Sequence, residues 1–301
     1  MKKVLCIGQS AYDITLPLDH YPVENQKTRI SYKVECGGGS SSNCAFLLAK
    51  WGLDTYFAGI IGNDHYGNCI LDEYVNVGVN TKYLQISKRF HTTSSYIIAN
   101  TSTGTRTILT NRDAGIKMSK VSILDNEFDY LIFDGYEKEF ALEAIKRNPN
   151  AVSILDAGSI KEATLELAHL VDYLICSHDF ANQFSNTEID YENIETIKKA
   201  YDALEKEFKH HVIITLESYG CFTKIDGEYI LVPSIKVKAV DSTGAGDIYH
   251  GAFMYGLTQG FSLEKTMRFA NITGALSCLK VGSRLSIPEL KDVEKAYNDS
   301  L

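Results

Sequence analysis

The sequence has few of the features that mark membrane proteins, disulfide-bonded proteins or nucleic-acid-binding proteins. Its 301 residues include five prolines and one tryptophan, and no apolar run reaches the roughly 18 residues of a membrane span. Its seven cysteines are scattered and form no C-x-x-C pair, which favours reduced thiols over a disulfide framework. A net charge of −8 argues against a nucleic-acid surface, which needs clustered lysine and arginine. We therefore expect a soluble, cytoplasmic protein with no nucleic-acid or membrane partner.

The sequence does contain an alternation of strand-like and helix-like segments. Short apolar runs such as VLCIG at 4–8 are typical of buried strands, whereas apolar residues within 191–208 recur at helical spacing. This alternation predicts a three-layer α/β/α fold, in which helices cover both faces of a mostly parallel central sheet. The expected segments are strands at 4–8, 55–61, 129–135, 151–158, 172–177 and 210–216, helices at 42–51, 65–78, 139–147, 163–171, 191–208, 244–258 and 263–279, and a hairpin at 221–233.

Two pairs of expected strands do not follow this alternation of strand and helix. Segments 12–19 and 28–36 form one pair, and segments 93–100 and 105–110 form the other. Because no helix separates the members of a pair, they predict a small β-sheet apart from the main one. No flexible linker is evident, so we expect one domain over residues 1–301, with this sheet as an outgrowth within about 12–36 and 93–110. Its exposed strand edges would be covered if two copies paired, which predicts a homodimer.

The segment DSTGAGD, residues 241–247, combines two carboxylates and two hydroxyls with glycines at 244 and 246. A helix is expected to begin here, and the unpaired N–H groups and partial positive charge of a helix N-terminus form an anion site. Asp247, in the first turn, would then be placed to accept a proton beside that site. The other interpretation is a helix cap, because serine, threonine and aspartate are usual N-cap residues. The residues alone leave both interpretations open.

A second glycine-rich junction, GGGSSSN, spans residues 37–43. Close backbone approach and several hydroxyls suit a polyhydroxy ligand, and Asn43 can both donate and accept hydrogen bonds; a flexible turn is the alternative. The segment is neither a P-loop nor a dinucleotide motif, because the required lysine and glycine spacing are missing. Asp13 lies in an apolar run, where a neighbour or ligand hydroxyls must satisfy its carboxylate. Arg106 and Arg112 flank the second hairpin, and exposed arginines are usually solvated.

Together and in this order, these motifs resemble the ribokinase-like (PfkB) family of sugar kinases over essentially the whole chain. DSTGAGD matches the family's D-[TS]-x-G-A-G-D signature. GGSSSN, with Gly52 and Gly62, matches its amino-terminal signature, except that Ser41 stands where glycine or alanine is usual. GQSAYD at 8–13 also fits, and STGTRTIL at 102–109 looks most like the ketohexokinase branch, which phosphorylates fructose. The resemblance implies a ribokinase-like fold with a small β-sheet as its lid.

The resemblance also implies a role for each matching residue. Asp247 would be the catalytic base that takes the proton from the sugar hydroxyl. The backbone amides that would form the anion hole are those of Gly244, Ala245 and Gly246. The residues that would hold the sugar are Asp13, Gly38, Gly39 and Asn43, with Arg106 reaching in from the small sheet.

A nucleotide site and a cation loop are implied in the same way. TLESYG at 215–220 looks like the family's nucleotide loop T-x-G-x-x-G, and the resemblance implies ATP and Mg²⁺ as cofactors. The residues that would bind the nucleotide are Thr215, Tyr219, Gly220 and, at an adenine-pocket position, Asn271. Some members hold a monovalent cation such as K⁺ in a loop that aligns here with Asp241, Thr243, Ser277, Lys280, Gly282 and Ser286.

Two motifs depart from the family pattern. The N-x-x-E motif, which helps to place magnesium and phosphates through water, is here SHDF, with Ser177 and Phe180 at its two defining positions. Glu217 stands where the nucleotide loop usually has glycine, and a carboxylate near phosphates repels them unless it points outward or contacts the ribose. Both departures concern the nucleotide, and neither concerns Asp247.

The leading hypothesis is an ATP-dependent kinase, a phosphotransferase with an alcohol acceptor, acting on a ketohexose such as fructose or a pentose such as ribose. A nucleoside or a sugar phosphate is an alternative substrate within the family. Aromatic residues available to stack on a base are Tyr12, Phe90 and Tyr96, and basic residues available to a phosphate are Lys27, Arg29, Lys33 and Arg106. A sugar- or nucleotide-binding protein without catalysis is the alternative from another class.

Overall fold

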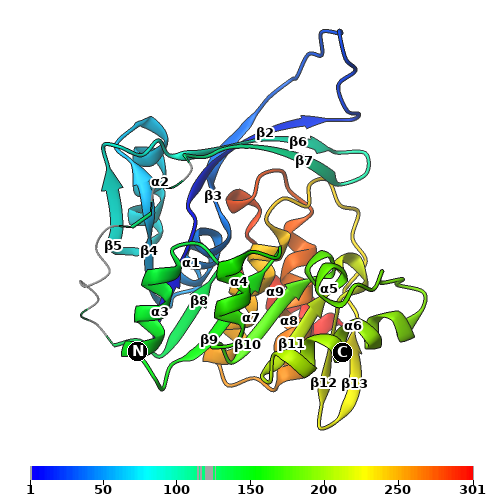
Figure 1. Cartoon of the computed structure of the whole chain (residues 1–301). Coiled ribbons are helices and arrows are strands. Elements are labelled where there is room, and N and C mark those ends of the chain that lie inside the picture. Colours follow the sequence, from blue (N-terminus) through cyan, green and yellow to red (C-terminus); the bar gives the residue numbers. More distant parts are fainter. Residues whose placement is uncertain (1, 114, 116, 119–124, 126, 301) are drawn as a thin grey trace.

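The structure is a computed structural model that describes residues 2–113, 115, 117–118, 125 and 127–300. The largest element of this part of the chain is a nine-stranded sheet (Figure 1). Neighbouring strands are parallel, except that β12 runs antiparallel to both of its neighbours. In spatial order the strands are β13 (Glu228–Val232), β12 (Cys221–Ile225), β11 (His211–Thr215), β10 (Tyr173–Ser177), β9 (Val152–Ala157), β8 (Tyr130–Phe133), β1 (Lys3–Ile7), β4 (Asp54–Gly62) and β5 (Asn80–Ser87).

Helices cover both faces of this sheet. In β1, Val4 and Cys6 belong to one apolar cluster and Leu5 and Ile7 to the other, because successive side chains of a strand point to opposite faces. The first cluster is filled by α1 (Ser40–Lys50), α2 (His65–Val77), α7 (Ala245–Thr258), α8 (Leu263–Ser277) and α9 (Leu290–Asp299). The second is filled by α3 (Lys138–Arg147), α4 (Glu162–Ala168), α5 (His178–Ser185) and α6 (Ile194–Glu207). The predicted three-layer fold is confirmed.

The small sheet that the sequence predicts is also present. Its strands lie in the order β3 (Val34–Gly38), β2 (Ala11–Leu18), β6 (Thr93–Asn100) and β7 (Thr105–Asn111). β2 and β6 are parallel, and the other two pairings are antiparallel. Figure 1 shows this sheet projecting beyond one end of the main sheet, so that it lies over the loops at that end.

One predicted strand is shorter than expected. The strand expected at 28–36 begins only at Val34, and residues 26–33 adopt no strand. β3 leaves its partner early, because it pairs with β2 only from Ala11 to Thr15, although β2 continues to Leu18 and pairs there with β6 alone. Elements that the sequence reasoning missed are β5, α5 and α9. Within the described ranges, no helix combines the length and apolar character needed to cross a membrane.

The order of the main sheet points to one place for a ligand. From β1 the chain crosses to β4 on one side and later to β8 on the other, so the direction of winding changes between β1 and β8. Ligands of open α/β sheets bind outside the carboxyl ends of the strands at such a switch point. Here those ends lead into Gly8 and Asp134, beneath the small sheet.

Candidate active site

A pocket of about 320 Å³ lies at this switch point, between the small sheet and the start of α7. Of the residues predicted to bind or react, it brings together Asp13, Gly39, Arg106, Thr243, Gly244 and Asp247. The other lining residues are Gln9, Ala11, Ser40, Ser95, Ile97, Ile108, Thr110, Arg112, Tyr136 and Ser283. The two glycine-rich junctions and the early aspartate, which are far apart in sequence, therefore share one cavity.

The geometry at the start of α7 distinguishes the two interpretations of residues 241–247, a side-chain helix cap and an open helix N-terminus. Gly244 is the N-cap residue, with a left-handed backbone (φ 76°), and no side chain caps the helix. Thr243 donates its N–H and hydroxyl to Oδ1 of Asp241, at 2.9 and 2.6 Å, and so turns away from the helix amides. Ala245 and Gly246 are the first residues of the helix. The side-chain cap is therefore ruled out, and the amides of Gly244 and Gly246 are open to an anion, whereas the Ala245 N–H donates to the Ser242 carbonyl at 3.3 Å.

Asp247 is held in place from α1. Asn43 Nδ2 donates to Asp247 Oδ2 at 2.8 Å, and the Cys44 thiol donates to the Asp247 carbonyl at 3.2 Å. Asn43 is fully buried and does not line the pocket, although the resemblance predicts that it holds the sugar. Its amide instead fixes the orientation of the predicted base, so that the other carboxylate oxygen is left for a ligand.

Asp13 faces the same cavity from β2. It is 5% exposed, and Oδ2 accepts a hydrogen bond from the Ser283 hydroxyl at 2.6 Å. Burial raises the pKa of the Asp13 carboxyl to about 6, the bond from Ser283 opposes this rise, and the charge of Asp247 adds to it. Gly38 packs directly against this carboxylate, since a Cβ there would lie 2.1 Å from Asp13 Oδ2. Glycine is thus required at this position by close approach rather than by a positive φ.

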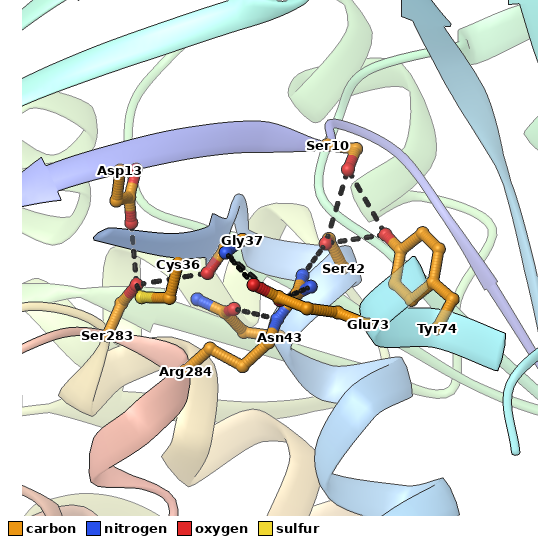
Figure 2. Close-up of polar contacts among 10 residues, drawn as sticks. All are labelled: Ser10, Asp13, Cys36, Gly37, Ser42, Asn43, Glu73, Tyr74, Ser283 and Arg284. Atoms are coloured by element: carbon orange, nitrogen blue, oxygen red, sulfur yellow. Dashed lines mark hydrogen bonds and ion pairs between the residues drawn. The ribbon is translucent and has the colours of Figure 1, made fainter. Parts of the chain in front are cut away.

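A buried arginine, which the sequence reasoning missed, links these groups (Figure 2). Arg284 is 2% exposed, and its Nη1 donates to Glu73 Oε2 at 2.6 Å while its Nη2 donates to Ser42 Oγ. Glu73 in turn accepts the Gly37 N–H at 3.0 Å, and Arg284 Nε donates to Asn43 Oδ1 at 3.4 Å. The segment after α8 is thereby joined to the glycine-rich junction, and Asn43 is held from both ends of its amide.

Asp134 is a second residue that the sequence reasoning missed. It follows β8 directly and accepts backbone N–H bonds from Gln9 at 2.9 Å, Ser41 at 3.1 Å and Tyr136 at 3.0 Å. Burial raises the pKa of this carboxyl, and the three backbone bonds oppose the rise. The Asp134 carboxylate therefore holds three segments together: the residues after β1, the first turn of α1 and the backbone of the pocket residue Tyr136.

The predicted nucleotide residues lie outside this pocket. Asn271 is buried, and its Nδ2 donates to the Val232 carbonyl at 2.9 Å and to Cys221 Sγ at 3.4 Å, next to Gly220. Tyr219 is 44% exposed and packs against Tyr191 with ring centres 4.6 Å apart. Thr215 ends β11, where its hydroxyl donates to the Cys176 carbonyl at 3.3 Å. The four residues thus lie around the β11–β12 connection and the neighbouring α8, close enough together to contact one nucleotide.

The two departures from the family pattern have clear structural consequences. Glu217 adopts the left-handed conformation (φ 51°) that favours the glycine usual at this position. Phe180 is fully buried in the core, and Ser177 caps α5 by accepting the Phe180 N–H at 3.1 Å. Neither Ser177 nor Phe180 therefore supplies a carboxylate, and the side chain of Asp179 between them is 68% exposed and lies 3.2 Å from His178. A buried carboxylate near this edge is that of Asp156, the penultimate residue of β9, whose Oδ2 lies 3.6 Å from His250 Nδ1 and whose pKa burial raises to about 6.

The residues of the predicted cation loop are neighbours in space. Asp241 is buried, and its Oδ2 accepts the Gly282 N–H at 2.9 Å. The Val240 N–H donates to the Cys278 carbonyl at 2.8 Å, which joins the segment before α7 to the end of α8. The hydroxyls of Ser277 and Ser286 donate to the carbonyls of Gly274 and Ser283. Two loops therefore meet at Asp241, and the binding of a cation there stays a prediction.

Comparison with known proteins identifies the class. Residues 1–290 match the family described as pfkB family carbohydrate kinase, so the chain belongs to that family. It is a carbohydrate kinase, a phosphotransferase with an alcohol group as acceptor.

Its relatives include several ribokinases. The ribokinase of Lactococcus lactis is 27% identical over 98% of this chain and 96% of its own length, and that of Bacillus subtilis is 24% identical over 98% and 99%. The crystal structure of Thermotoga maritima ribokinase superimposes with a TM-score of 0.80 at 26% identity, covering 99% of each chain. That of Arabidopsis thaliana ribokinase complexed with ribose and ATP gives 0.79 at 24% identity, covering 98% of each chain. The likeness to the ketohexokinase branch stays a prediction.

Proposed function

We propose that this carbohydrate kinase transfers the γ-phosphoryl group of ATP to a hydroxyl of a small sugar, a pentose such as ribose or a ketohexose such as fructose. One observation carries this proposal: Asp247 lines the pocket at the uncapped start of α7, and Asp13 lines it from β2. The naming of relatives as ribokinases, one of them bound to ribose and ATP, supports it.

In the proposed reaction, Asp247 accepts the proton of the acceptor hydroxyl as its oxygen attacks the γ-phosphorus, and ADP leaves with the bridging oxygen. Asn43 keeps the carboxylate turned toward the acceptor through its 2.8 Å hydrogen bond. The amides of Gly244 and Gly246 stabilise the charge on the transferred group, and the Ala245 N–H, which donates to the Ser242 carbonyl at 3.3 Å, lies between them. Arg106, whose Nη1 donates to Ser242 Oγ at 3.0 Å, adds a positive charge beside this anion hole.

The sugar would be held by Asp13 and the glycine-rich junction. A pKa of about 6 leaves the Asp13 carboxylate mostly ionised at neutral pH, so that it accepts hydrogen bonds from sugar hydroxyls. Gly38 and Gly39 let the sugar approach the backbone closely. The hydroxyls of Ser283 and Ser95 both hydrogen-bond to the Asp13 carboxylate and hold its orientation in the pocket.

The nucleotide would bind along the β11–β12 connection, through Thr215, Tyr219, Gly220 and Asn271. Magnesium prefers oxygen ligands and keeps several waters, and the carboxylates of Asp156 and Asp247 fit it in that way. A monovalent cation such as K⁺ would bind in the loops joined at Asp241. We place the enzyme in the cytoplasm, since its seven cysteines are free thiols, which suits a reducing compartment.

A substrate panel tests the proposed reaction. Release of ADP is measured for fructose, ribose, adenosine and a hexose phosphate, each with ATP and magnesium. We expect turnover with a sugar and a lower kcat/KM for adenosine, because no described aromatic side chain other than Tyr136 lines the pocket to stack on a base. Absence of turnover on every compound, with sugar binding seen by calorimetry, would instead establish a binding protein.

We further propose a homodimer formed through the small sheet. All residues of β7 are exposed, and on the face opposite the pocket Tyr96 and Leu109 are paired across β6 and β7 while 43% and 59% exposed. We expect sedimentation equilibrium to show a dimer at micromolar concentration, and Leu109→Glu to convert it to a monomer, because a charge would then be buried in the contact. A monomeric wild-type protein would count against this.

A further inference from the structure

The edge strand β7 directs two arginines to opposite ends of the pocket. Side chains alternate between the faces of a strand, and the residues of this segment that line the pocket are Arg106, Ile108, Thr110 and, directly after β7, Arg112. Six positions separate the two arginines, or roughly 20 Å along an extended chain. They therefore serve different parts of a bound ligand.

The strand register gives the order of groups along the pocket. Arg106 lies at the anion hole, since it donates to Ser242. Thr110 pairs with Ser95, and Ser95 pairs with Asp13, so Asp13 is level with Thr110. Arg112 follows two residues further on. A sugar held by Asp13, with its reacting hydroxyl toward the anion hole, thus turns its other end toward Arg112.

Among the described residues, Arg112 has a nitrogen atom whose capacity to donate hydrogen bonds is unused. Its Nη1 atom is buried and makes no hydrogen bond within the described part of the chain. Glu137 is near enough for the charge of Arg112 to oppose the burial that raises the Glu137 pKa. The two do not form an ion pair, however, and Glu137 Oε2 accepts the Met118 N–H at 2.8 Å. A buried donor without a partner is costly to a folded protein and commonly marks a position that a ligand completes.

A second cation contacts the same aromatic ring as Arg112, although it does not line the pocket. The Arg112 Cζ and Lys161 Nζ atoms lie 4.0 and 4.1 Å from the centre of the Tyr136 ring, which itself lines the pocket. A guanidinium stacked on a ring keeps its N–H edge free, and that edge matches the two oxygens of a carboxylate or phosphate. Because Asp134 holds the Tyr136 backbone, this platform is fixed before any ligand arrives.

We infer that the preferred acceptor is an anionic derivative of such a sugar, a sugar acid or a sugar phosphate, whose carboxylate or phosphate group is bound by Arg112 at the end of the pocket remote from the anion hole. This inference rests on the proposed kinase reaction and names its substrate class. Lys161 adds charge, and Tyr136 orients the guanidinium. The phosphoryl transfer itself is unchanged, because the anionic group lies at the far end of the sugar from the hydroxyl that reacts.

The test compares matched substrates and variants. We would measure kcat and KM for fructose, for fructose 1-phosphate and 6-phosphate, and for the sugar acids gluconate and 2-ketogluconate. The enzymes are the wild type, Arg112→Gln, Arg112→Lys and the control Arg89→Gln, which removes an exposed arginine outside the pocket. Thermal unfolding of each variant separates a folding defect from a binding defect.

We expect one class of anionic sugar to exceed fructose in kcat/KM by at least about tenfold in the wild type. Arg112→Gln should raise the KM for that substrate about 10- to 100-fold, as loss of a charge-assisted hydrogen bond does, with little change for fructose. Arg112→Lys should restore part of the loss, and Arg89→Gln should change nothing. Efficient turnover of neutral sugars alone, or equal effects of Arg112→Gln on fructose and the anionic sugar, would overturn this inference only. No turnover of any sugar would instead overturn the proposed kinase reaction.

Discussion

Replacing Asp247 with asparagine is expected to lower kcat at least about a hundredfold, the usual contribution of general acid–base assistance. The amide has the same shape as the carboxylate but cannot take up the proton of the acceptor hydroxyl. Because Asn43 already donates to this side chain, the new amide can accept the same hydrogen bond. The structure around the site and the KM for sugar should therefore change little.

The measurement is steady-state ADP release by Asp247→Asn, with sugar binding followed by calorimetry. Asp19→Asn, an equally isosteric change in the exposed segment after β2, is the matched control and should keep wild-type activity. A variant at position 247 that retains kcat within a few-fold of the wild type would show that another group is the base.

Replacing Arg284 with methionine should have the largest effect on stability. Arg284 is buried, whereas the side chain of its partner Glu73 is 28% exposed, so the charge left unpaired is partly solvated and the expected cost is about 3 kcal/mol of the free energy of unfolding, the lower end of the range for buried pairs. Glu73 would lose its cation while it still accepts the Gly37 N–H, and Ser42 would lose a hydrogen bond. Asn43 would also lose one of its contacts, so activity should fall together with stability.

Urea unfolding checks this expectation. Arg268→Met is the matched control, because Arg268 pairs with Glu264 at 3.7 Å on the surface of α8, and such pairs contribute about 0–1 kcal/mol. The double variant Glu73→Met with Arg284→Met should be more stable than the sum of the single changes implies, since no buried charge is then left alone. An Arg284→Met variant as stable as Arg268→Met would refute the importance of the buried pair.

Local sequence patterns were sufficient for much of the fold and for part of the site. Helical spacing over 191–208 predicted α6, and alternating segments predicted the three layers. The glycines and carboxylates of 37–43 and 241–247 predicted two junctions, which the structure brings together with Asp13. Patterns failed in 28–36, where only Val34–Gly38 pairs although the neighbouring strand continues, and in β5, where apolar residues are few.

The buried polar groups were the hardest to predict. Arg284 in GSRLSIP has no local feature that separates it from a surface arginine, because its burial depends on Glu73, Ser42 and Asn43. Asp134 did carry a signal, since it is a carboxylate directly after a buried strand. Carboxyl ends of parallel strands meet at the site, and this rule applied to FDG would have placed Asp134 there. Asn43 was predicted to touch sugar, and its burial beneath Asp247 became visible only in three dimensions.

The contact between Arg284 and Glu73 also bears on how the chain acquires its structure during synthesis. The two residues are 211 positions apart, and at translation rates of 5–20 residues per second roughly 10 to 40 seconds pass between their appearance. Throughout that interval the nascent glycine-rich junction has no guanidinium to neutralise Glu73 or to hold Asn43. The amino-terminal half therefore cannot settle into its final state on the ribosome by itself. The sugar pocket is completed only when the segment that contains Ser283 and Arg284 has been made.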